Sequence, residues 1–278
     1  MTQVQLKPSM GVLKLHQQVE ANRFRLVRYA PSEEIGFFVK HYWIVSWDLT
    51  AAGDEPFLQE VVPNPCVNLV VERGKSAIFA PAKQRHAHYI EGKGTVFGVK
   101  FKPGGFYPFV KTAISGMAEH PLGLHEVFGA EARETEHAFL TEANGDERMV
   151  ELAEAMIRPK LPVPDENVTL INRIVDQVCE DRTLTKVDEL CESFDLNKRK
   201  LQRLFEQYVG VSPKWMIRLY RIQNAAEAID LGEEHDWLQL SLKLGYYDQA
   251  HFTKDFKLLV GKTPEEYGRK QAAIHDPA

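Results

Sequence analysis

A run of cations and amides between residues 197 and 203 offers the clearest chemistry in this sequence. The run holds Asn197, Lys198, Arg199, Lys200, Gln202 and Arg203, and no acid follows before Glu206. Arginine can pair with O6 and N7 of guanine, and glutamine with N6 and N7 of adenine. On a helix such a run is more often only a solvated face, so its use depends on the elements that position it.

A second, weaker set follows at residues 248–257. It offers Gln249, His251, Thr253, Lys254 and Lys257, but Asp248 and Asp255 dilute its positive charge. The whole chain has a net charge of −5, and the segment from Asp165 onward holds more acids than bases. Because most DNA-binding domains are basic, overall charge does not predict contact with DNA. The prediction depends on where the cations lie.

Both sets belong to an internal repeat with an offset of 51 residues. Residues 201–213 and 252–264 share an apolar residue, a phenylalanine four positions later and then Val-Gly. Glycine tolerates the left-handed conformation that ends many helices. Ser212-Pro213 and Thr263-Pro264 follow, each a capping side chain with a proline suited to the first turn of a new helix. A helical bundle with a duplicated hairpin would show the same repeat.

The segment before each copy favours a more specific interpretation. Residues 185–197 predict a short helix, a tight turn and an Asn197 cap, and residues 237–248 predict the same plan with Gly245 in the turn and Asp248 as the cap. A short helix, a tight turn and a longer helix form a helix-turn-helix unit, whose second helix enters the major groove.

The spacing of the two units agrees with this interpretation. Residues 212–231 predict one unbroken helix, which would span roughly 30 Å at 1.5 Å per residue. Successive major-groove faces on one side of DNA lie about 34 Å apart. A rigid helix of this length would hold two units in successive turns of one duplex.

Residues 245–267 closely resemble the signature of the AraC/XylS family of bacterial transcription regulators, over a long stretch without gaps. Residues 201–221 resemble the first unit and connecting helix of that family. The resemblance covers roughly residues 168–269 and implies a seven-helix domain that binds promoter DNA asymmetrically, with RNA polymerase as a partner if the protein is an activator.

The resemblance also implies roles for individual residues. The base-reading positions would be Arg199, Gln202, Arg203, Ala250, His251 and Lys254, and phosphate or helix-start positions would be Asn197, Lys198, Lys200, Asp248, Gln249, Thr253 and Lys257. Two residues depart from the family pattern. Asp195 stands where the turn often has glycine, although aspartate can adopt the left-handed conformation. Ala250 can at most touch a thymine methyl group, so we expect the first unit to carry more of the specificity.

The first half of the chain predicts short strands. Residues 41–49, 61–72 and 95–101 are rich in β-branched and aromatic residues, and Phe97, Val99 and Phe101 would share one face. Turns are expected at Gly53-Asp54, Arg73-Gly74 and Gly92-Lys93-Gly94. This pattern favours a barrel or sandwich. The half also resembles an uncharacterised domain found ahead of AraC-type modules, which implies a cupin-like barrel followed by helices that dimerise.

The sequence therefore predicts an α+β chain of two domains. Helical spacing at residues 130–143 and 147–156, with a break at 144–146, follows the strands, and three prolines between 158 and 165 predict a stiff linker. We expect a β-rich sensor or dimerisation domain at 1–161, a linker at 162–166 and an all-α DNA-binding domain at 167–278. A small-molecule effector at the first domain and a homodimer are also expected.

Two clusters in the first half have alternative interpretations. His86 and His88 with Glu91 could hold a metal ion, but edge-strand histidines are favoured and no metal or cofactor is expected. Trp43 and Trp47 would share a strand face, where filling the core is favoured over lining a ligand pocket.

The rival classes of function are an enzyme and a DNA-binding protein without a regulatory role. A DNA-repair enzyme fused to a helix-turn-helix module would use a reactive cysteine, yet Cys66 lies in Pro-Asn-Pro-Cys-Val-Asn without an adjacent histidine. The three cysteines are widely spaced, which is typical of reduced thiols. With no apolar segment of membrane length and no signal core, a cytoplasmic protein is expected.

Overall fold

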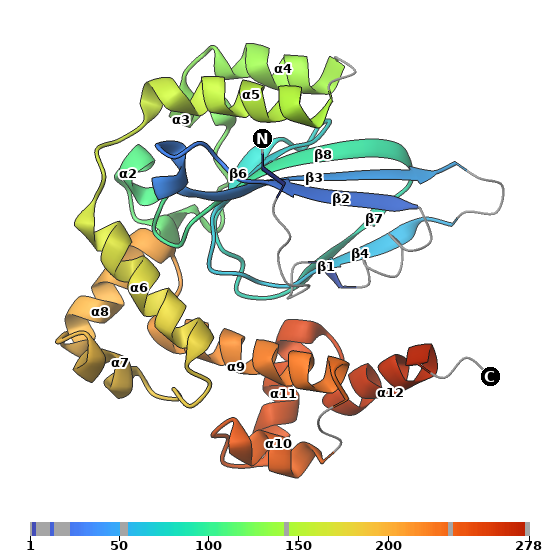
Figure 1. Cartoon of the computed structure of the whole chain (residues 1–278), viewed down its shortest axis with the longest axis vertical. Helices are drawn as coiled ribbons and strands as arrows, with labels where there is room; N and C mark the ends of the chain where they lie inside the picture. Colours follow the sequence, from blue (N-terminus) through green and yellow to red (C-terminus); the bar gives the residue numbers. More distant parts are fainter. Residues whose placement is uncertain are drawn as a thin grey trace.

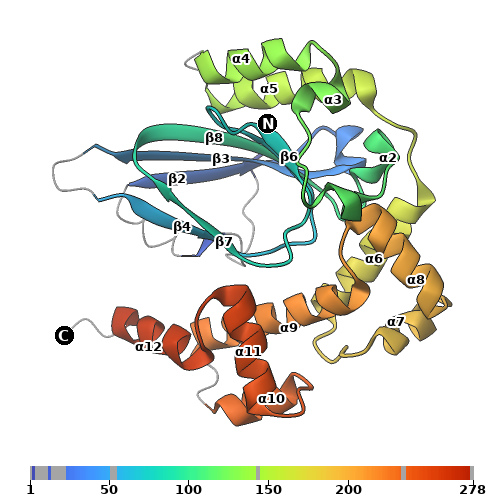
Figure 2. The same ribbon diagram turned by 180° about the vertical axis from the view of Figure 1, so that it is seen from behind.

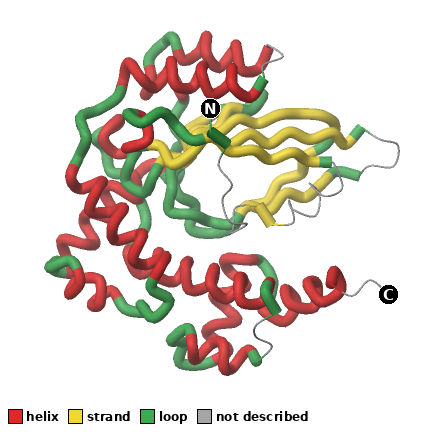
Figure 3. The backbone as a smooth tube through the Cα atoms, in the orientation of Figure 1, coloured by secondary structure: helices red, strands yellow, loops and turns green. Residues whose placement is uncertain are grey.

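The computed structural model describes residues 2–3, 12–13, 23–50, 55–141, 145–232 and 236–275. Its first half combines two antiparallel sheets with a group of helices, and its second half is helical (Figure 1). Figure 3 shows the strands as one block, with helices on two sides of it. The chain is thus of the α+β class, as the sequence predicts.

The larger sheet has five antiparallel strands in the order β2-β3-β8-β5-β6. The strands are β2 (Phe24–Tyr29), β3 (Val39–Leu49), β8 (Gly92–Phe101), β5 (Asn68–Val71) and β6 (Ala77–Phe79). Side chains alternate between the two faces of a strand. Phe97, Val99 and Phe101 are at most 2% exposed and belong to one core cluster, so their predicted shared face is confirmed.

A smaller sheet packs on the other face, which makes the strand region a sandwich. It consists of β1 (Val12–Leu13), β4 (Phe57–Val61) and β7 (His86–Ile90) in the order β1-β4-β7. Phe24, Val45, Leu49 and Ile90 form the buried cluster at this contact, and Trp43 and Trp47 pack against it. The two tryptophans therefore fill core space, as favoured from the sequence.

Helices cover the opposite face of the larger sheet (Figures 1 and 2). They are α2 (Tyr107–Val110), η2 (Ile114–Met117), α3 (Leu124–Phe128), α4 (Ala132–Thr141), α5 (Asp146–Ile157) and η3 (Arg158–Lys160). The first residue of α5 fixes this layer to the sheet edge, because Asp146 accepts hydrogen bonds from Arg25 and Tyr29 of β2.

One predicted turn is confirmed, and another lies earlier than expected: the chain passes from β7 to β8 at residues 91–92, where Gly92 has a φ of +62°. Gly74 adopts a φ of +75° in the turn after β5. Residues 92–94, in contrast, begin β8, where Gly94 pairs with Trp47. A Cβ added at Gly94 would lie 2.9 Å from Cε2 of Trp47, so this glycine makes room for the indole ring. The turn expected at 53–54 and part of the break at 144–146 lie outside the described residues.

The second half consists of seven α-helices and one wider helical turn among the described residues. They are α6 (Glu166–Glu180), α7 (Val187–Ser193), α8 (Lys198–Leu204), η4 (Phe205–Val209), α9 (Pro213–Asp230), α10 (Trp237–Lys243), α11 (Gln249–Val260) and α12 (Pro264–His275). They enclose a separate core that includes Ile171, Leu190, Phe205, Ile222 and Phe252. Helix α6 begins at Glu166, inside the predicted linker, because Asp165 caps it by accepting from Asn167 N at 2.8 Å. Within the described residues, no helix has the length and apolar character needed to cross a bilayer.

Candidate nucleic-acid interface

The first helix-turn-helix unit, defined as residues 187–209, is built from local signals. Helix α7 ends at a turn in which Asp195 has a φ of +50°, the left-handed conformation expected from the sequence. Asn197 then caps α8, accepting from Lys200 N at 2.8 Å. A capping side chain of this kind stabilises a helix by about 1 kcal/mol.

Helix α8 turns its polar side chains outward. Leu201 and Leu204 are buried in the helical core, whereas Arg199, Gln202 and Arg203 are exposed. Among the described residues none forms a hydrogen bond or ion pair with these three side chains. Asn197, Lys198 and Lys200 are exposed beside them. The first exposed face, defined as Arg199, Gln202 and Arg203, is therefore available to a ligand.

Lys198 differs from its neighbours because it has a protein partner. Its Nζ lies 2.7 Å from Oδ1 of Asp188 on α7, and both side chains are more than half exposed. The bond to Asp188 raises the pKa of Lys198. Exposed pairs of this kind contribute little to stability, so the lysine can exchange this partner for a phosphate.

The second unit, residues 237–260, repeats the plan. Gly245 follows α10 with a φ of +72°, and Asp248 caps α11 by accepting from His251 N at 2.7 Å. The second exposed face, defined as Ala250, His251 and Lys254, is open to solvent. Of the flanking positions, Gln249 and Lys257 are exposed and Thr253 is half-buried.

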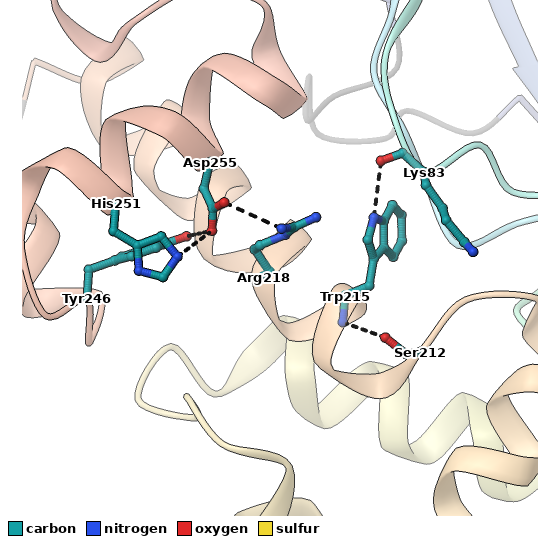
Figure 4. A network of polar contacts seen from close by, with 7 residues as sticks. All are labelled: Lys83, Ser212, Trp215, Arg218, Tyr246, His251 and Asp255. Carbon is teal, nitrogen blue, oxygen red and sulfur yellow. Dashed lines mark hydrogen bonds and ion pairs between the residues drawn. The ribbon is translucent and has the colours of Figure 1, made fainter.

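Asp255 corrects one expectation from the sequence. It does not dilute the positive charge of the exposed face, because it is 5% exposed and points into the domain. Its Oδ2 accepts from the Tyr246 hydroxyl at 3.2 Å, and its Oδ1 lies 3.4 Å from Nη1 of Arg218 on α9 (Figure 4). Burial, and then Asp255, raise the pKa of Tyr246. The carboxylate therefore anchors the second unit to the connecting helix.

His251 lies beside the same two residues, Asp255 and Tyr246. Its Nε2 lies 3.8 Å from Oδ2 of Asp255, and its ring packs edge-on against Tyr246 with centroids 5.3 Å apart. The Arg221 guanidinium lies over the Tyr246 ring, 3.9 Å from its centroid. The contact between Arg221 and Tyr246 was missed from the sequence, since it joins residues 25 positions apart.

Helix α9 joins the two units as one continuous element. Ser212 caps it by accepting from Trp215 N at 3.1 Å, and Pro213 occupies its first turn. Its 18 residues span about 27 Å at 1.5 Å per residue. The unbroken connecting helix expected from the sequence is present, and its buried residues include Met216, Leu219 and Ile222.

The first half of the chain contacts both units and the connecting helix. Gly210 and Gly261, which end the second helix of each unit at φ values of +86° and +89°, lie against Ile114 and Arg85 respectively. Trp215 of α9 donates from Nε1 to the Lys83 carbonyl at 3.2 Å (Figure 4). The two exposed faces lie outside these contacts.

The other candidate clusters occupy structural positions. His86 and His88 lie on the edge strand β7 with their rings 6.3 Å apart, as favoured from the sequence. The described residues contain no group of three or more His, Cys, Asp or Glu side chains that could hold a metal ion. Cys66 is 4% exposed in the segment before β5.

Each half of the chain matches a model of a known protein family. Residues 190–270 match the family model described as "Helix-turn-helix domain", and residues 27–134 match the one described as "Domain of unknown function (DUF6597)". The chain is 30% identical over 88 residues to a protein of Haemophilus influenzae named "Uncharacterized HTH-type transcriptional regulator", covering 32% of this chain and 29% of that protein. It is 31% identical over 99 residues to the F1 operon positive regulatory protein of Yersinia pestis, covering 35% and 33%.

These matches cover only part of each protein. The chain spans about a third of the length of the curated relatives that it matches. Among solved structures, that of ToxT from Vibrio cholerae covers 89% of this chain and 98% of its own at 14% identity, with a TM-score of 0.37. Residues 190–270 of this chain form an AraC-type helix-turn-helix domain, and residues 27–134 belong to the DUF6597 family of domains.

Proposed function

We propose that this chain is a sequence-specific DNA-binding transcription regulator. The observation that carries the proposal is the pair of exposed faces on α8 and α11, held by one continuous helix of about 27 Å. Successive major grooves on one side of a duplex lie about 34 Å apart, so tilted or slightly bent DNA would meet both faces.

The two exposed faces would read bases. In the first, Arg199 and Arg203 suit guanine and Gln202 suits adenine. In the second, His251 and Lys254 would supply hydrogen bonds and Ala250 a contact to a thymine methyl group. The flanking residues would contact phosphates or fix the helix starts; they are Asn197, Lys198, Lys200, Asp248, Gln249, Thr253 and Lys257.

The two separate cores support the assignment of a different role to each half of the chain. We assign residues 1–161 to a cupin-like sensor or dimerisation domain, 162–166 to a linker and 167–278 to DNA binding. The contacts at Gly210, Gly261 and Trp215 give the first domain a means to alter how the two units are presented. A small-molecule effector, a homodimer, RNA polymerase contact and action in the cytoplasm belong to this proposal, and we assign no enzymatic activity.

Selection of bound duplexes from a random library by the full chain tests the function. The expected result is an asymmetric site whose two halves lie about 10 base pairs apart, because the units would enter successive turns of the groove. In salt titrations, the affinity of the chain for this site should exceed its affinity for random DNA at every salt concentration. Equal affinity and an equal salt slope on all sequences would instead identify a non-specific DNA-binding protein.

A further inference from the structure

The turns of the two helix-turn-helix units can be aligned residue by residue through their backbone hydrogen bonds. In the first unit, the Leu196 amide donates to the Cys191 carbonyl, five residues earlier, at 2.9 Å. In the second, the Tyr246 amide donates to the Ser241 carbonyl over the same span and distance. Leu196 and Tyr246 also both pack against the helical core. They are therefore equivalent positions of the internal repeat.

The second unit has one additional residue after this position. In the first unit, Leu196 is followed directly by the cap of α8, Asn197. In the second, Tyr247 stands between Tyr246 and the cap of α11, Asp248. Because the first unit closes the same turn without such a residue, the fold of the repeat does not require Tyr247.

The side chain of this additional residue projects into solvent. Tyr247 is 93% exposed, whereas Tyr246 beside it is 5% exposed. Among the described residues, none bonds to the Tyr247 hydroxyl or stacks on its ring. Turns are usually built from glycine, proline, asparagine, aspartate or serine, and an aromatic ring left in water gains nothing from burial. Both the ring and the hydroxyl of Tyr247 are thus available to another molecule.

Tyr247 lies at the end of α11 that would enter DNA. It directly precedes Asp248, which caps α11, and the second exposed face begins at Ala250. The N-terminal residues of a recognition helix are those that contact base edges. A helix with its side chains is about 10–12 Å wide and nearly fills the major groove, which is about 12 Å wide. A side chain just outside the start of the helix therefore meets the wall of the groove, which consists of phosphates and sugars.

The start of α11 also carries less positive charge than the start of α8. The first turn of α8, residues 198–200, consists of three cations, whereas the first turn of α11, residues 249–251, contains no lysine or arginine. Phosphates beside the start of α11 therefore need another donor. The Tyr247 hydroxyl is a neutral donor at this place.

We infer that Tyr247 contacts the DNA backbone beside the half-site of the second unit, with its hydroxyl donating to a phosphate oxygen and its ring packing on the adjoining deoxyribose. Tyrosine is among the side chains that bond to phosphates in DNA complexes, and such contacts fix the register and orientation of a protein on the duplex without reading its sequence. Tyr247 is thus a positioning residue for α11. The inference rests on the proposed DNA binding and adds one residue to it.

A neutral phosphate contact has a distinct dependence on salt. A lysine or arginine that neutralises a phosphate releases counter-ions, so its removal reduces the slope of log K against log salt by about 0.9. The phenol of Tyr247 neutralises no charge. Loss of its hydroxyl should therefore weaken binding and leave the slope unchanged.

Titration of the full chain on its selected duplex and on a scrambled one, at several salt concentrations, tests the inference. Tyr247→Phe should weaken binding about 5-fold, because it removes one hydrogen bond, and Tyr247→Ala should weaken it further, because the ring contact is lost as well. Both losses should be similar on the two duplexes, with the wild-type salt slope. Lys257→Ala, at a flanking cation of α11, should instead reduce the slope by about 1.

A modified duplex identifies the phosphate. Single phosphates across the half-site of the second unit are replaced, one at a time, by uncharged methylphosphonates. At one position the replacement should weaken wild type about 5-fold more than it weakens Tyr247→Phe, because the variant has already lost that contact. The comparison is a double-mutant cycle in which the second change is made in the DNA.

Tyr89→Phe and Tyr89→Ala, at an exposed tyrosine of β7, are matched controls and should bind as wild type does. Because Tyr247 is exposed, its variants should unfold at the wild-type Tm. Wild-type affinity of both Tyr247 variants, a loss confined to the selected duplex, a slope reduced by about 1 or a lower Tm overturns the inference, and so does the absence of a phosphate position that distinguishes wild type from Tyr247→Phe.

Failure of the proposed function would look different. It would appear as equal affinity of the wild-type chain for the selected and the scrambled duplex. The ratio of variant to wild-type affinity can be measured on either duplex, so it tests Tyr247 by itself.

Discussion

The guanidinium of Arg85 lies directly against Gly261, the residue that ends the second helix of the second unit. A Cβ added at Gly261 would be 2.6 Å from Cζ of Arg85, and Glu60 of β4 holds the same guanidinium through Oε1 at 2.5 Å from Nη1. Glycine is required here twice, because its φ is +89° and because a side chain would displace Arg85. The contact ties the smaller sheet to the end of α11.

Gly261→Ala is therefore expected to cost more than backbone strain alone. The left-handed conformation costs an alanine about 1–2 kcal/mol, and the overlap with Arg85 adds to it. The free energy of unfolding from urea denaturation measures the loss. Gly74→Ala is the control, since Gly74 has a similar φ of +75° and no atom within 4 Å of an added Cβ.

In an Arg85→Ala background the excess cost of Gly261→Ala over Gly74→Ala should disappear. Such a cycle isolates the interaction of two contacting residues. Equal costs for the two glycine substitutions in the wild-type background would show that Arg85 does not constrain α11.

Gln223→Pro is expected to separate the two units. Gln223 lies in the middle of α9, where proline removes a backbone hydrogen bond and costs about 3 kcal/mol. Protection of DNA from cleavage should then shrink from two adjacent half-sites to one, with weaker binding. Gln223→Ala, which keeps the helix, should retain the full protected length; an unchanged footprint in the proline variant would contradict the role of α9.

The left-handed conformation of Asp195 predicts that alanine and glycine at this position differ in the free energy of unfolding. Because its φ is +50°, Asp195→Ala should lower the free energy of unfolding by about 1 kcal/mol, whereas Asp195→Gly should stay within about 0.5 kcal/mol of wild type. Chemical denaturation of both variants provides the measurement, with Glu192→Ala on exposed α7 as a control. Alanine tolerated as well as glycine would argue against strain in this turn.

What could be predicted from the sequence depended on short-range signals. The caps at Asn197 and Ser212 and the stop at Gly210 involve residues within five positions of each other, so the helix limits followed from them. The spacing of Asp255 from Phe252 and Leu259 places it on the buried face of α11, but its partners Tyr246 and Arg218 lie outside that helix, so the contacts that satisfy the carboxylate could not be read from the sequence.

The contacts between the two halves of the chain also could not be predicted from the sequence. The pairing of β4 with β7 brings Arg85 toward Gly261 across 176 positions of the chain. The order of the five strands in the larger sheet is likewise not specified by the alternation within each strand. Such long-range pairings have no local signature.

Tyr208 is expected to make stability depend on pH in the alkaline range. Burial, and then the bond from its hydroxyl to Oδ2 of Asp165 at 2.7 Å, raise its pKa to about 12 from 10.0. The neutral phenol is favoured in the folded state, so its contribution is complete below pH 10 and is lost as the pH rises through about 12.

Tyr208→Phe should therefore lower the free energy of unfolding by about 1 kcal/mol at pH 7. The difference from wild type should shrink between pH 10 and 12. Urea unfolding at several pH values measures it, and Tyr89→Phe, at an exposed tyrosine of β7, controls for the loss of one phenol. A difference that stays constant up to pH 12 would contradict the bond to Asp165.

The two exposed faces should contribute unequally to specificity. Arg203 has no partner among the described residues and can form two hydrogen bonds to guanine, each such pair giving about 1–3 kcal/mol of discrimination. In the second face, Ala250 offers no hydrogen bond, and the ring of His251 lies near the carboxylate of Asp255. Arg203→Ala should thus reduce affinity for the selected site by about 10-fold or more and relax the base preference there.

Lys254→Ala should have a smaller effect that is similar on all sequences, and Lys243→Ala, outside both faces, serves as the control. Titration of each variant on the selected and on a scrambled duplex, at fixed salt, measures both quantities. A larger specific loss for Lys254→Ala than for Arg203→Ala would reverse the assignment, because the second unit would then be the main source of base recognition.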